Sequence, residues 1–322
     1  FERALRKGRP FSCAPCRSPT TGYTSGVEGR GRLTAHKAID VRFFAPPADL
    51  APCFTSFYRV EVDLPEGEIL EDWLQPEWAN LRFFAGNAPA ADFTDGSRVE
   101  GMRFQATGPS SCPTHFTIGR TRMWGIGLFP LGWARFVGLD ASEHANTVVD
   151  GERSPAFAPF VPLCEKLCTP DHSDEEQFEW LTDFFRNLAD PPRDCARIQR
   201  IHEAMVDPYI VQVEELAQKC GLSKRTLERI CLRHFGFSPR LLLRRQRLMR
   251  SLAAFMLEPR ANWSRVIDRH YHDQSHFVHE FHAFMQCAPS EYAAKPHPVL
   301  SAFMAERKKV WGSPVQTLDK PG

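Results

Sequence analysis

The chain has 322 residues, of which 43% are hydrophobic and 25% are charged, and its formal net charge is +1. This length predicts two domains, and the composition is typical of a soluble globular protein. The apolar runs are too short to cross a bilayer and we expect no secretory leader, which disfavours a membrane or secreted protein. Ten scattered Cys predict reduced thiols in the cytoplasm rather than a disulfide framework.

The charge is unevenly distributed along the chain. Residues 41–190 carry a net charge of −12, whereas residues 191–322 carry +8. Such asymmetry predicts a basic module that contacts a polyanion, joined to an acidic module that does not.

Residues 1–40 mix Gly, Pro, Ser, Thr and Arg without periodicity. We predict that they are a disordered or non-native N-terminal extension. Cys13 and Cys16 form a Cys-x-x-Cys pair there, but no second pair or His lies at zinc-binding spacing. A structural zinc site normally needs four ligands, so we expect no metal to bind.

Residues 41–165 have the pattern of short strands separated by Gly and Pro turns. The clearest candidates are residues 54–62, 80–84 and 124–129, which predict a mainly β domain of barrel or sandwich type. We assign residues 41–190 to this domain and expect it to sense an effector or to associate. Its four Trp either line a ligand pocket or, as we favour, fill the core: Trp73, Trp78, Trp124 and Trp133.

From Glu175 onward the pattern becomes helical. Phe178, Leu181 and Phe185 lie at helical spacing, and the prolines at 191 and 192 then end the helix. We place the junction between the domains at residues 189–194. An all-α domain is expected over residues 191–295, followed by a C-terminal tail over residues 296–322.

The last third of the chain contains two copies of one pattern, offset by fifty residues. In the first copy, an amphipathic stripe over residues 213–220 is followed by Gly221, Ser223 and a second stripe. The second copy repeats this from residue 263, with Asp273 in the place of Ser223. Gly221 suits a sharp reversal, and Ser223 and Asp273 suit the N-cap of a helix. Each copy therefore predicts a helix-turn-helix unit, whose second helix enters the DNA major groove.

A long helix is expected between the two units. Residues 239–257 have Pro at the start, no internal Gly and strong helix formers throughout. A helix of this length spans roughly 28 Å, and successive major-groove faces of B-DNA lie about 34 Å apart. The helix is therefore long enough to hold two reading helices one turn of the duplex apart.

These segments resemble the AraC/XylS family of transcription regulators. The resemblance covers about residues 195–295 and rests on five segments: 215–229 (ELAQKCGLSKRTLER), 236–239 (GFSP), 247–248 (RL), 271–277 (YHDQSHF) with Phe281, and 288–292 (APSEY). The acidic half also resembles an N-terminal region of some members at residues 127–133 (GLFPLGW). The resemblance implies that the C-terminal module binds DNA and that the N-terminal domain senses an effector or dimerises.

The chain departs from this family at three places. His270 and Tyr271 stand where the family usually has Gly in the second turn, and Gln286 replaces another usual Gly. A non-Gly residue adopts the left-handed conformation at a cost of roughly 1–2 kcal/mol, so the second unit is expected to be less exact. Gln212 is also a poorer N-cap than the usual Ser or Thr.

The side chains that face outward on the two second helices are the candidate base-reading residues. Arg225 and Arg229 suit bidentate contacts to guanine, and Gln274 suits adenine. Glu228 either accepts from cytosine or pairs with Arg225 or Arg229. The full set is Lys224, Arg225, Glu228 and Arg229 in the first unit, and Gln274, Ser275, Val278 and His279 in the second. Because the second set lacks Arg, we expect the first unit to dominate specificity.

A second group of residues is expected to contact DNA phosphates. Arg side chains on the long helix are expected to set the affinity for phosphates and its salt sensitivity. The candidates are Ser223, Arg240, Arg244, Arg245, Arg250 and His276.

Residues 270–282 contain five of the twelve His. Pairs such as His276 and His279 share a helical face and are a possible zinc or nickel site. We favour a role without metal because only Cys287 lies nearby as a further ligand. Protonation below pH ~6.5 would add positive charge near the DNA.

Enzymatic function is not expected, because the sequence lacks a His-Glu-x-x-His zinc motif, a Gly-x-Ser-x-Gly elbow and a phosphate-binding Gly loop. We predict a cytoplasmic, sequence-specific DNA-binding transcription regulator without a cofactor. Its expected partners are promoter DNA and RNA polymerase, with a small-molecule effector and a homodimer as further possibilities. The alternative is a metal-binding or small-ligand-binding protein, without enzymatic activity, whose helical repeat does not read DNA.

Overall fold

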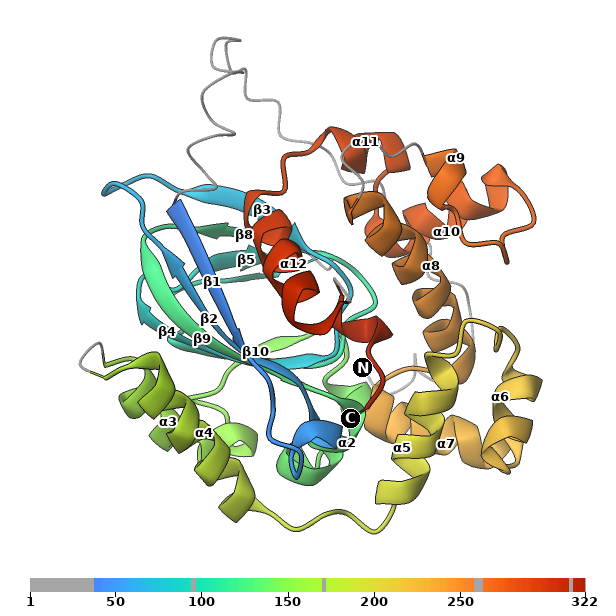
Figure 1. The fold of residues 1–322 in the computed structure, drawn as a ribbon, viewed down its shortest axis with the longest axis horizontal. Coiled ribbons are helices and arrows are strands. Elements are labelled where there is room, and N and C mark those ends of the chain that lie inside the picture. The colour runs from blue at the N-terminus through green and yellow to red at the C-terminus, as the bar shows by residue number, and fades with distance from the viewer. Residues whose placement is uncertain (1–37, 94–96, 170–171, 258–262, 313–314, 322) are drawn as a thin grey trace.

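The computed structural model describes residues 38–93, 97–169, 172–257, 263–312 and 315–321. An antiparallel two-sheet region comes first in the chain, and a helical region follows it (Figure 1). The expected fold class, a mainly β N-terminal domain before an all-α region, is confirmed. The predictions for residues 1–37, including Cys13 and Cys16, lie outside the described residues.

The larger sheet has six antiparallel strands, whose spatial order is β1 (Ile39–Phe44), β2 (Phe54–Val62), β9 (Thr121–Leu128), β4 (Ala79–Gly86), β7 (Phe104–Thr107) and β10 (Val148–Asp150). The smaller sheet has the order β3 (Leu70–Leu74), β8 (Thr114–Ile118), β5 (Ala90–Asp92) and β6 (Arg98–Val99). Val60 and Phe84 of the larger sheet share one core with Phe116 and Ile118 of the smaller sheet. The two sheets therefore pack face to face as a sandwich.

Short helical segments connect the strands and lead to the outer face of the larger sheet. They are η1 (Ala51–Cys53), α2 (Pro130–Gly132), the π-helical η2 (Trp133–Val137), η3 (Ala141–Glu143) and η4 (Pro155–Phe160). Helices α3 (Val161–Leu167) and α4 (Asp174–Leu188) then lie against this face (Figure 1). Phe178 of α4 stacks on Phe44 with ring centroids 5.0 Å apart, and Phe185 contacts Phe54 at 4.8 Å.

The four Trp of the sheet region act as packing residues. Trp78, Trp124 and Trp133 are fully buried, and Trp124 donates a hydrogen bond to Gln177 of α4 at 2.7 Å. Trp73 is half-buried, with Lys295 Nζ 3.9 Å from its ring centroid. None of the four lines the cavity between the sheets. The core interpretation is therefore confirmed for Trp78, Trp124 and Trp133, whereas Trp73 lies outside the buried core.

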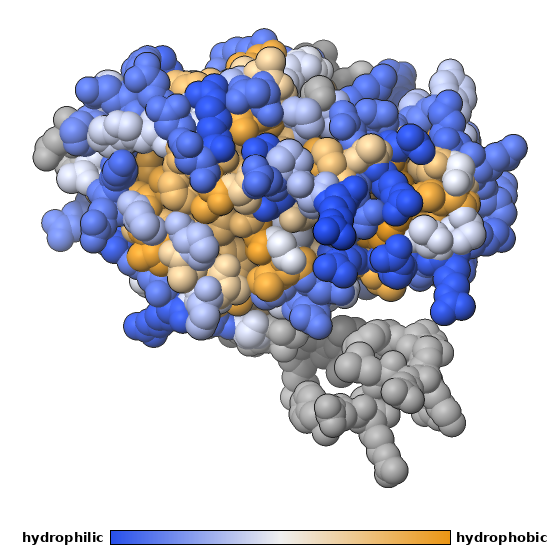
Figure 2. Space-filling view, turned by 90° about the horizontal axis from the view of Figure 1, so that it is seen from below, coloured by the Kyte–Doolittle hydropathy of each residue, from blue (hydrophilic) through white to orange (hydrophobic). Residues whose placement is uncertain are grey.

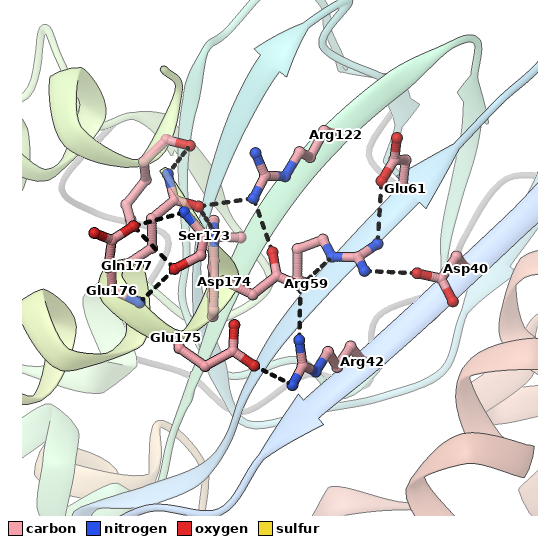
Figure 3. Close-up of polar contacts among 12 residues, drawn as sticks. Asp40, Arg42, Arg59, Glu61, Arg122, Ser173, Asp174, Glu175, Glu176 and Gln177 are labelled. Carbon is pink, nitrogen blue, oxygen red and sulfur yellow. Dashed lines mark hydrogen bonds and ion pairs between the residues drawn. The ribbon is translucent and has the colours of Figure 1, made fainter. Parts of the chain in front are cut away.

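The start of α4 is fixed to the larger sheet by one carboxylate. Arg42, Arg59 and Arg122 reach it from three neighbouring strands, and all three guanidinium groups contact Asp174, at 3.3, 3.1 and 2.8 Å (Figure 3). Burial alone would raise the pKa of Asp174, but the arginines outweigh it and hold the pKa below its usual value. Ser173 caps the same helix end and accepts a hydrogen bond from the backbone N–H of Glu176.

The helical region comprises α5 (Cys195–Met205), α6 (Val213–Cys220), α7 (Lys224–Phe235), α8 (Pro239–Leu257), α9 (Trp263–Val266), α10 (Gln274–Met285), α11 (Pro289–Ala294), α12 (Pro298–Trp311) and the short η5 (Gln316–Leu318). Helix α8 has the bounds that the sequence predicts. Leu242 and Leu243 at its start belong to a core with α6 and α7, whereas Leu248 and Leu252 belong to a second core with α10. One helix therefore takes part in two cores.

Residues 296–322, expected to be a tail, contain helix α12, which packs against β1 and β3 beside the sandwich (Figure 1). Phe303 of α12 contacts Phe43 and Tyr58 at centroid distances of 4.7 and 4.8 Å. The buried carboxylate of Asp72 on β3 accepts hydrogen bonds from the backbone N–H groups of Val299 and Leu300, at 2.9 and 2.8 Å. Asp72 thus caps the first turn of α12 from a different part of the chain.

The sheet region and the first helical unit share one continuous hydrophobic core. His202 of α5 contacts Phe129 at 4.8 Å and Trp78 at 5.5 Å, and Trp78 also contacts Phe235 of α7. Burial, with a smaller effect from the charge of Arg245, lowers the pKa of His202 to about 3. His202 is therefore neutral in the folded protein at physiological pH.

None of the helices formed by the described residues combines the length and the apolar character that a bilayer crossing requires. The face seen from below carries hydrophobic side chains in separate areas, with hydrophilic side chains between them (Figure 2). Among the large apolar side chains, Ile69, Tyr209 and Val310 are the most exposed, and they lie on three different segments.

Replacing Asp174 with Ala is expected to lower the free energy of unfolding by about 2–4 kcal/mol, because three arginines lose their shared, largely buried partner. Urea denaturation of the two proteins measures this. Glu175→Ala is the matched control, since this exposed neighbour pairs with Arg42 alone, and it should change stability little. Equal effects of the two substitutions would contradict the role of Asp174.

The neutral state of His202 predicts a pH dependence of stability. Between pH 7 and pH 5 the unfolded chain binds a proton at this residue while the folded chain does not, so stability falls as pH falls. The expected contribution is about 2 kcal/mol, taking an unfolded pKa of about 6.5. Urea denaturation at both pH values should show a smaller decrease for His202→Met than for the unchanged chain. Parallel profiles would contradict the buried, neutral state.

Candidate nucleic-acid interface

The first helix-turn-helix unit has the local geometry that the sequence predicts. Gly221, between α6 and α7, has φ +65°, and the hydroxyl of Ser223 accepts a hydrogen bond from the N–H of Thr226 at 3.2 Å. At the start of α6, the carboxylate of Glu215 accepts from the N–H groups of Val211 and Gln212, both at 3.0 Å. Glu215 therefore supplies the capping that Gln212 was expected to lack.

Helix α7 buries one face and exposes the other. Leu227, Ile230 and Cys231 are buried in the first core. The four residues predicted to read bases are all exposed, and together they line a shallow surface that also includes Thr226 and Leu232: Lys224, Arg225, Glu228 and Arg229. Lys224 forms an ion pair with Glu214 of α6. Within the described chain, Glu228 forms no ion pair with Arg225 or Arg229.

The second unit differs from the first in its opening helix. The sequence pattern extends to His270, but α9 ends at Val266. Asp268 gives the physical reason, because its carboxylate accepts from the N–H of His270 at 2.9 Å and its own N–H donates to Ser251 at 2.8 Å. These side-chain contacts replace the next helical hydrogen bonds. The cap of α10 is confirmed, since Asp273 accepts from the N–H of His276 at 2.7 Å.

The two departures from the family at Gly positions have different consequences. Gln286 has φ +57°, so the expected left-handed conformation after α10 is confirmed. His270 and Tyr271 do not have a positive φ, so the expected strain at the second turn is absent. Instead, a ring nitrogen of His270 contacts the carbonyl oxygen of Pro208 at 3.0 Å, and the hydroxyl of Tyr271 donates to Glu280 at 2.9 Å. Both side chains therefore fix the second unit in place.

Helix α10 exposes all four of the residues predicted to read bases: Gln274, Ser275, Val278 and His279. Its opposite face, with Phe277, Phe281 and Met285, is buried in the second core. The two recognition helices thus each present a continuous exposed face, and only α7 adds Lys and Arg to it.

Glu280 is an acidic residue on the buried face of α10, and it joins this helix to α8. Its carboxylate accepts hydrogen bonds from Arg247 at 2.7 Å, from Arg244 at 2.9 Å and from Tyr271 at 2.9 Å. Burial alone would raise its pKa, but the hydrogen bonds from Arg247 and Arg244 outweigh this and lower the pKa. A buried ion pair with these satisfied contacts fixes the position of α10 relative to α8.

The residues predicted to contact phosphates fall into three groups. Arg240 is exposed, and Ser223 and His276 lie at the N-terminal ends of α7 and α10. Arg244 forms an ion pair with Glu280, and Arg250 forms an ion pair with Asp268. Arg245 is fully buried.

The position of Arg245 differs from the prediction. Its guanidinium donates to the backbone oxygen of Ser110 at 2.9 Å and lies 4.0 Å from the ring centroid of Trp78. It therefore connects α8 to the sheet region and does not share the exposed surface of Arg240. The helical pattern could have indicated this, because Arg245 lies on the same stripe as Leu242, Met249 and Leu252.

A cleft lies between the two units. It is lined by the start of α6, the first turns of α8 and one face of α10, with five basic side chains: Arg240, Arg244, Arg247, His276 and His279. Sequence reasoning did not assign a role to Arg247 or Glu280. A signal for Glu280 exists, since it is an acidic residue between Phe277, Phe281 and Phe284 on an apolar face. The units also meet where Arg269 lies 4.5 Å from the ring centroid of Tyr209.

The described part of the chain contains no group of three or more His, Cys, Asp or Glu that could hold a metal ion. The rings of His272 and His276 stack with centroids 5.6 Å apart. His276 also lies 4.0 Å from Glu280.

The model of one protein family, described as a helix-turn-helix domain, matches residues 216–295. No curated protein matches the chain. Solved structures of ToxT from Vibrio cholerae are similar at 12% identity. One covers 79% of this chain and 97% of that chain with a TM-score of 0.41. Another, bound to (E)-4-(8-methylnaphthalen-1-yl)but-3-enoic acid, covers 70% and 97% with a TM-score of 0.42.

The AraC-like transcriptional activator CuxR is similar at 13% identity over 70% of this chain and 89% of that chain, with a TM-score of 0.24. The matched residues 216–295 contain most of the first unit, α8 and the whole second unit. They lie within the segment, about residues 195–295, over which the sequence resembles the AraC/XylS regulators. The match shows that residues 216–295 of this chain form a helix-turn-helix domain.

Proposed function

We propose that the chain is a sequence-specific DNA-binding transcription regulator in which α7 and α10 read adjacent major-groove segments. The observation that carries the proposal is that α7 and α10 each expose one face while both helices pack on α8. Helix α10 is also fixed to α8 through the hydrogen bonds of Glu280. A rigid separation of two reading helices is what recognition along one side of a duplex requires.

The two recognition helices contribute unequally. Helix α7 presents Arg225 and Arg229, whose planar guanidinium groups suit two hydrogen bonds to guanine. Helix α10 presents Gln274, which suits two hydrogen bonds to adenine, and Ser275, whose hydroxyl suits more than one base. Arg240 and the helix N-termini at Ser223 and His276 contact phosphates and supply affinity that does not depend on sequence. Specificity therefore comes mainly from the first unit.

The N-terminal sheet domain, residues 41–190, senses a small effector or associates with a second copy, and RNA polymerase is the partner at the promoter. Support comes from the contacts between this domain and the DNA-binding region. Arg245 and His202 are buried against Trp78. A change in the sheet domain is thus transmitted to α8 through packed side chains. ToxT, which is similar to this chain, is solved with an unsaturated fatty acid bound.

Replacing Arg229 with Ala is expected to weaken binding by roughly 1–3 kcal/mol and to relax preference at one base pair, because a bidentate contact to guanine is lost. Competition assays with duplexes substituted at single positions measure both effects. The matched control is Arg153→Ala, which removes the same charge from a highly exposed site in the sheet domain. An unchanged preference at every position would contradict the assignment of Arg229.

Arg240 and Arg245 are expected to respond differently to the same substitution, although both stand on α8. Arg240→Met should make the slope of log affinity against log salt concentration less steep by about 1, the value of one phosphate contact, since an exposed cation is removed. Arg245→Met should leave this slope unchanged, because the guanidinium is buried against Trp78. Binding titrations at several salt concentrations measure the slopes. A binder whose helical repeat does not read DNA would show neither a steep slope nor this difference.

A further inference from the structure

A cavity of about 130 Å³ lies between the two sheets and is closed on one side by α12. Val60, Phe84 and Met123 line it from the larger sheet, and Phe116 and Ile118 line it from the smaller sheet. Met249 of α8 and Phe303 and Met304 of α12 complete the wall. The cavity therefore joins the sheet domain to the helix between the two units and to the helix that follows them.

Three of the residues that line this mainly apolar cavity have buried polar atoms without a hydrogen-bond partner among the described residues. These atoms are Nε and Nη1 of Arg307, the hydroxyl of Thr317 and Oε1 of Gln75. Arg307 and Thr317 are 1% and 0% exposed. A buried donor without a partner is unfavourable, so three N–H and O–H groups able to donate favour a molecule that brings an acceptor oxygen.

The charges around the cavity are already balanced. Arg82 pairs with Glu77 at 2.6 Å, and Glu77 also accepts a hydrogen bond from Gln316 at 2.8 Å. Arg307 pairs with Asp319. A carboxylate entering the cavity would be a third buried negative charge against two cations, and burial of an unbalanced charge is strongly unfavourable. A carbonyl oxygen accepts from Arg307 or Thr317 without adding charge.

We propose that this cavity binds a neutral, apolar carbonyl compound, with its oxygen at Arg307 and Thr317. The proposal rests on the effector-sensing function proposed for the N-terminal domain. An apolar cavity of about 150 Å³ in another protein holds benzene, so a cavity of this size suits a ring with one short substituent. Because the walls include α8 and α12, the occupied cavity contacts the DNA-binding region directly.

Helix α12 forms a wall of the cavity that does not belong to either sheet. Apart from its apolar contacts, it is attached through Asp72, which accepts from the N–H groups of Val299 and Leu300 and contacts His297 at 3.0 Å. The sheets on the other sides are held by continuous strand pairing.

The test uses three probes of the same shape and about nine non-hydrogen atoms each, a size that suits a small pocket. The first probe is acetophenone, a neutral carbonyl compound. The second is α-methylstyrene, in which a CH2 group replaces the carbonyl oxygen, and the third is the anion benzoate. Isothermal titration of the full chain should show acetophenone binding at least tenfold tighter than each of the others. Binding of benzoate more tightly than acetophenone, or the absence of binding by all three, would overturn the proposal.

Two variants locate the contact. Arg307→Met and Thr317→Val should each reduce the preference for acetophenone over α-methylstyrene while leaving α-methylstyrene binding nearly unchanged. The second variant is nearly isosteric and remains informative if the first does not fold. Ala91→Leu, which adds volume on the lining strand β5, should remove binding of both probes. An unchanged preference in both polar variants would contradict the proposed site.

DNA binding measured on the same samples separates the two proposals. Sequence-specific DNA binding without acetophenone binding overturns the ligand inference alone. Acetophenone binding with the expected response of the variants, but without DNA binding, supports the cavity assignment and contradicts the regulator function.

Discussion

The arrangement of the DNA-binding region depends on the buried carboxylate of Glu280. Arg244, Arg247 and Tyr271 all donate to it, so α10 is fixed to α8 by hydrogen bonds as well as by apolar packing. Removing the carboxylate would leave two cations without a partner in a half-buried site, which costs more than the pair contributes when intact. The charge network and the buried side chains of Phe277 and Phe281 together hold the second recognition helix against α8.

Helix α8 connects the second recognition helix to the first unit and to the sheet domain. Its first turns pack with α6 and α7, its last turns pack with α10, and Arg245 reaches from its middle to Trp78 in the sheet domain. Helix α12 then returns from the second unit to β1 and β3. The sheet domain thus contacts the DNA-binding region twice, before and after the second unit. Two attachments of this kind provide a physical route for coupling a bound effector to DNA binding.

The sequence predicted the local features well, because they depend on few residues. The bounds of α8, the left-handed Gly221 and the caps at Ser223 and Asp273 follow from side-chain chemistry within one turn. The exposure of the residues predicted to read bases follows from helical spacing. The buried position of Arg245, the capping of α12 by Asp72 and the network around Glu280 join residues far apart in the chain. Such contacts need the tertiary arrangement, and a charged side chain alone does not indicate whether it meets DNA or Trp78.

The most direct test of the central claim is selection of random duplex DNA with the full chain, followed by sequencing. The full chain is needed because the first unit shares its core with the sheet domain. Two rigidly joined reading helices predict a recovered motif with two short conserved blocks about ten base pairs apart. The block read by α7 should be the stronger of the two. Recovery of no motif at low salt would contradict DNA reading by this domain.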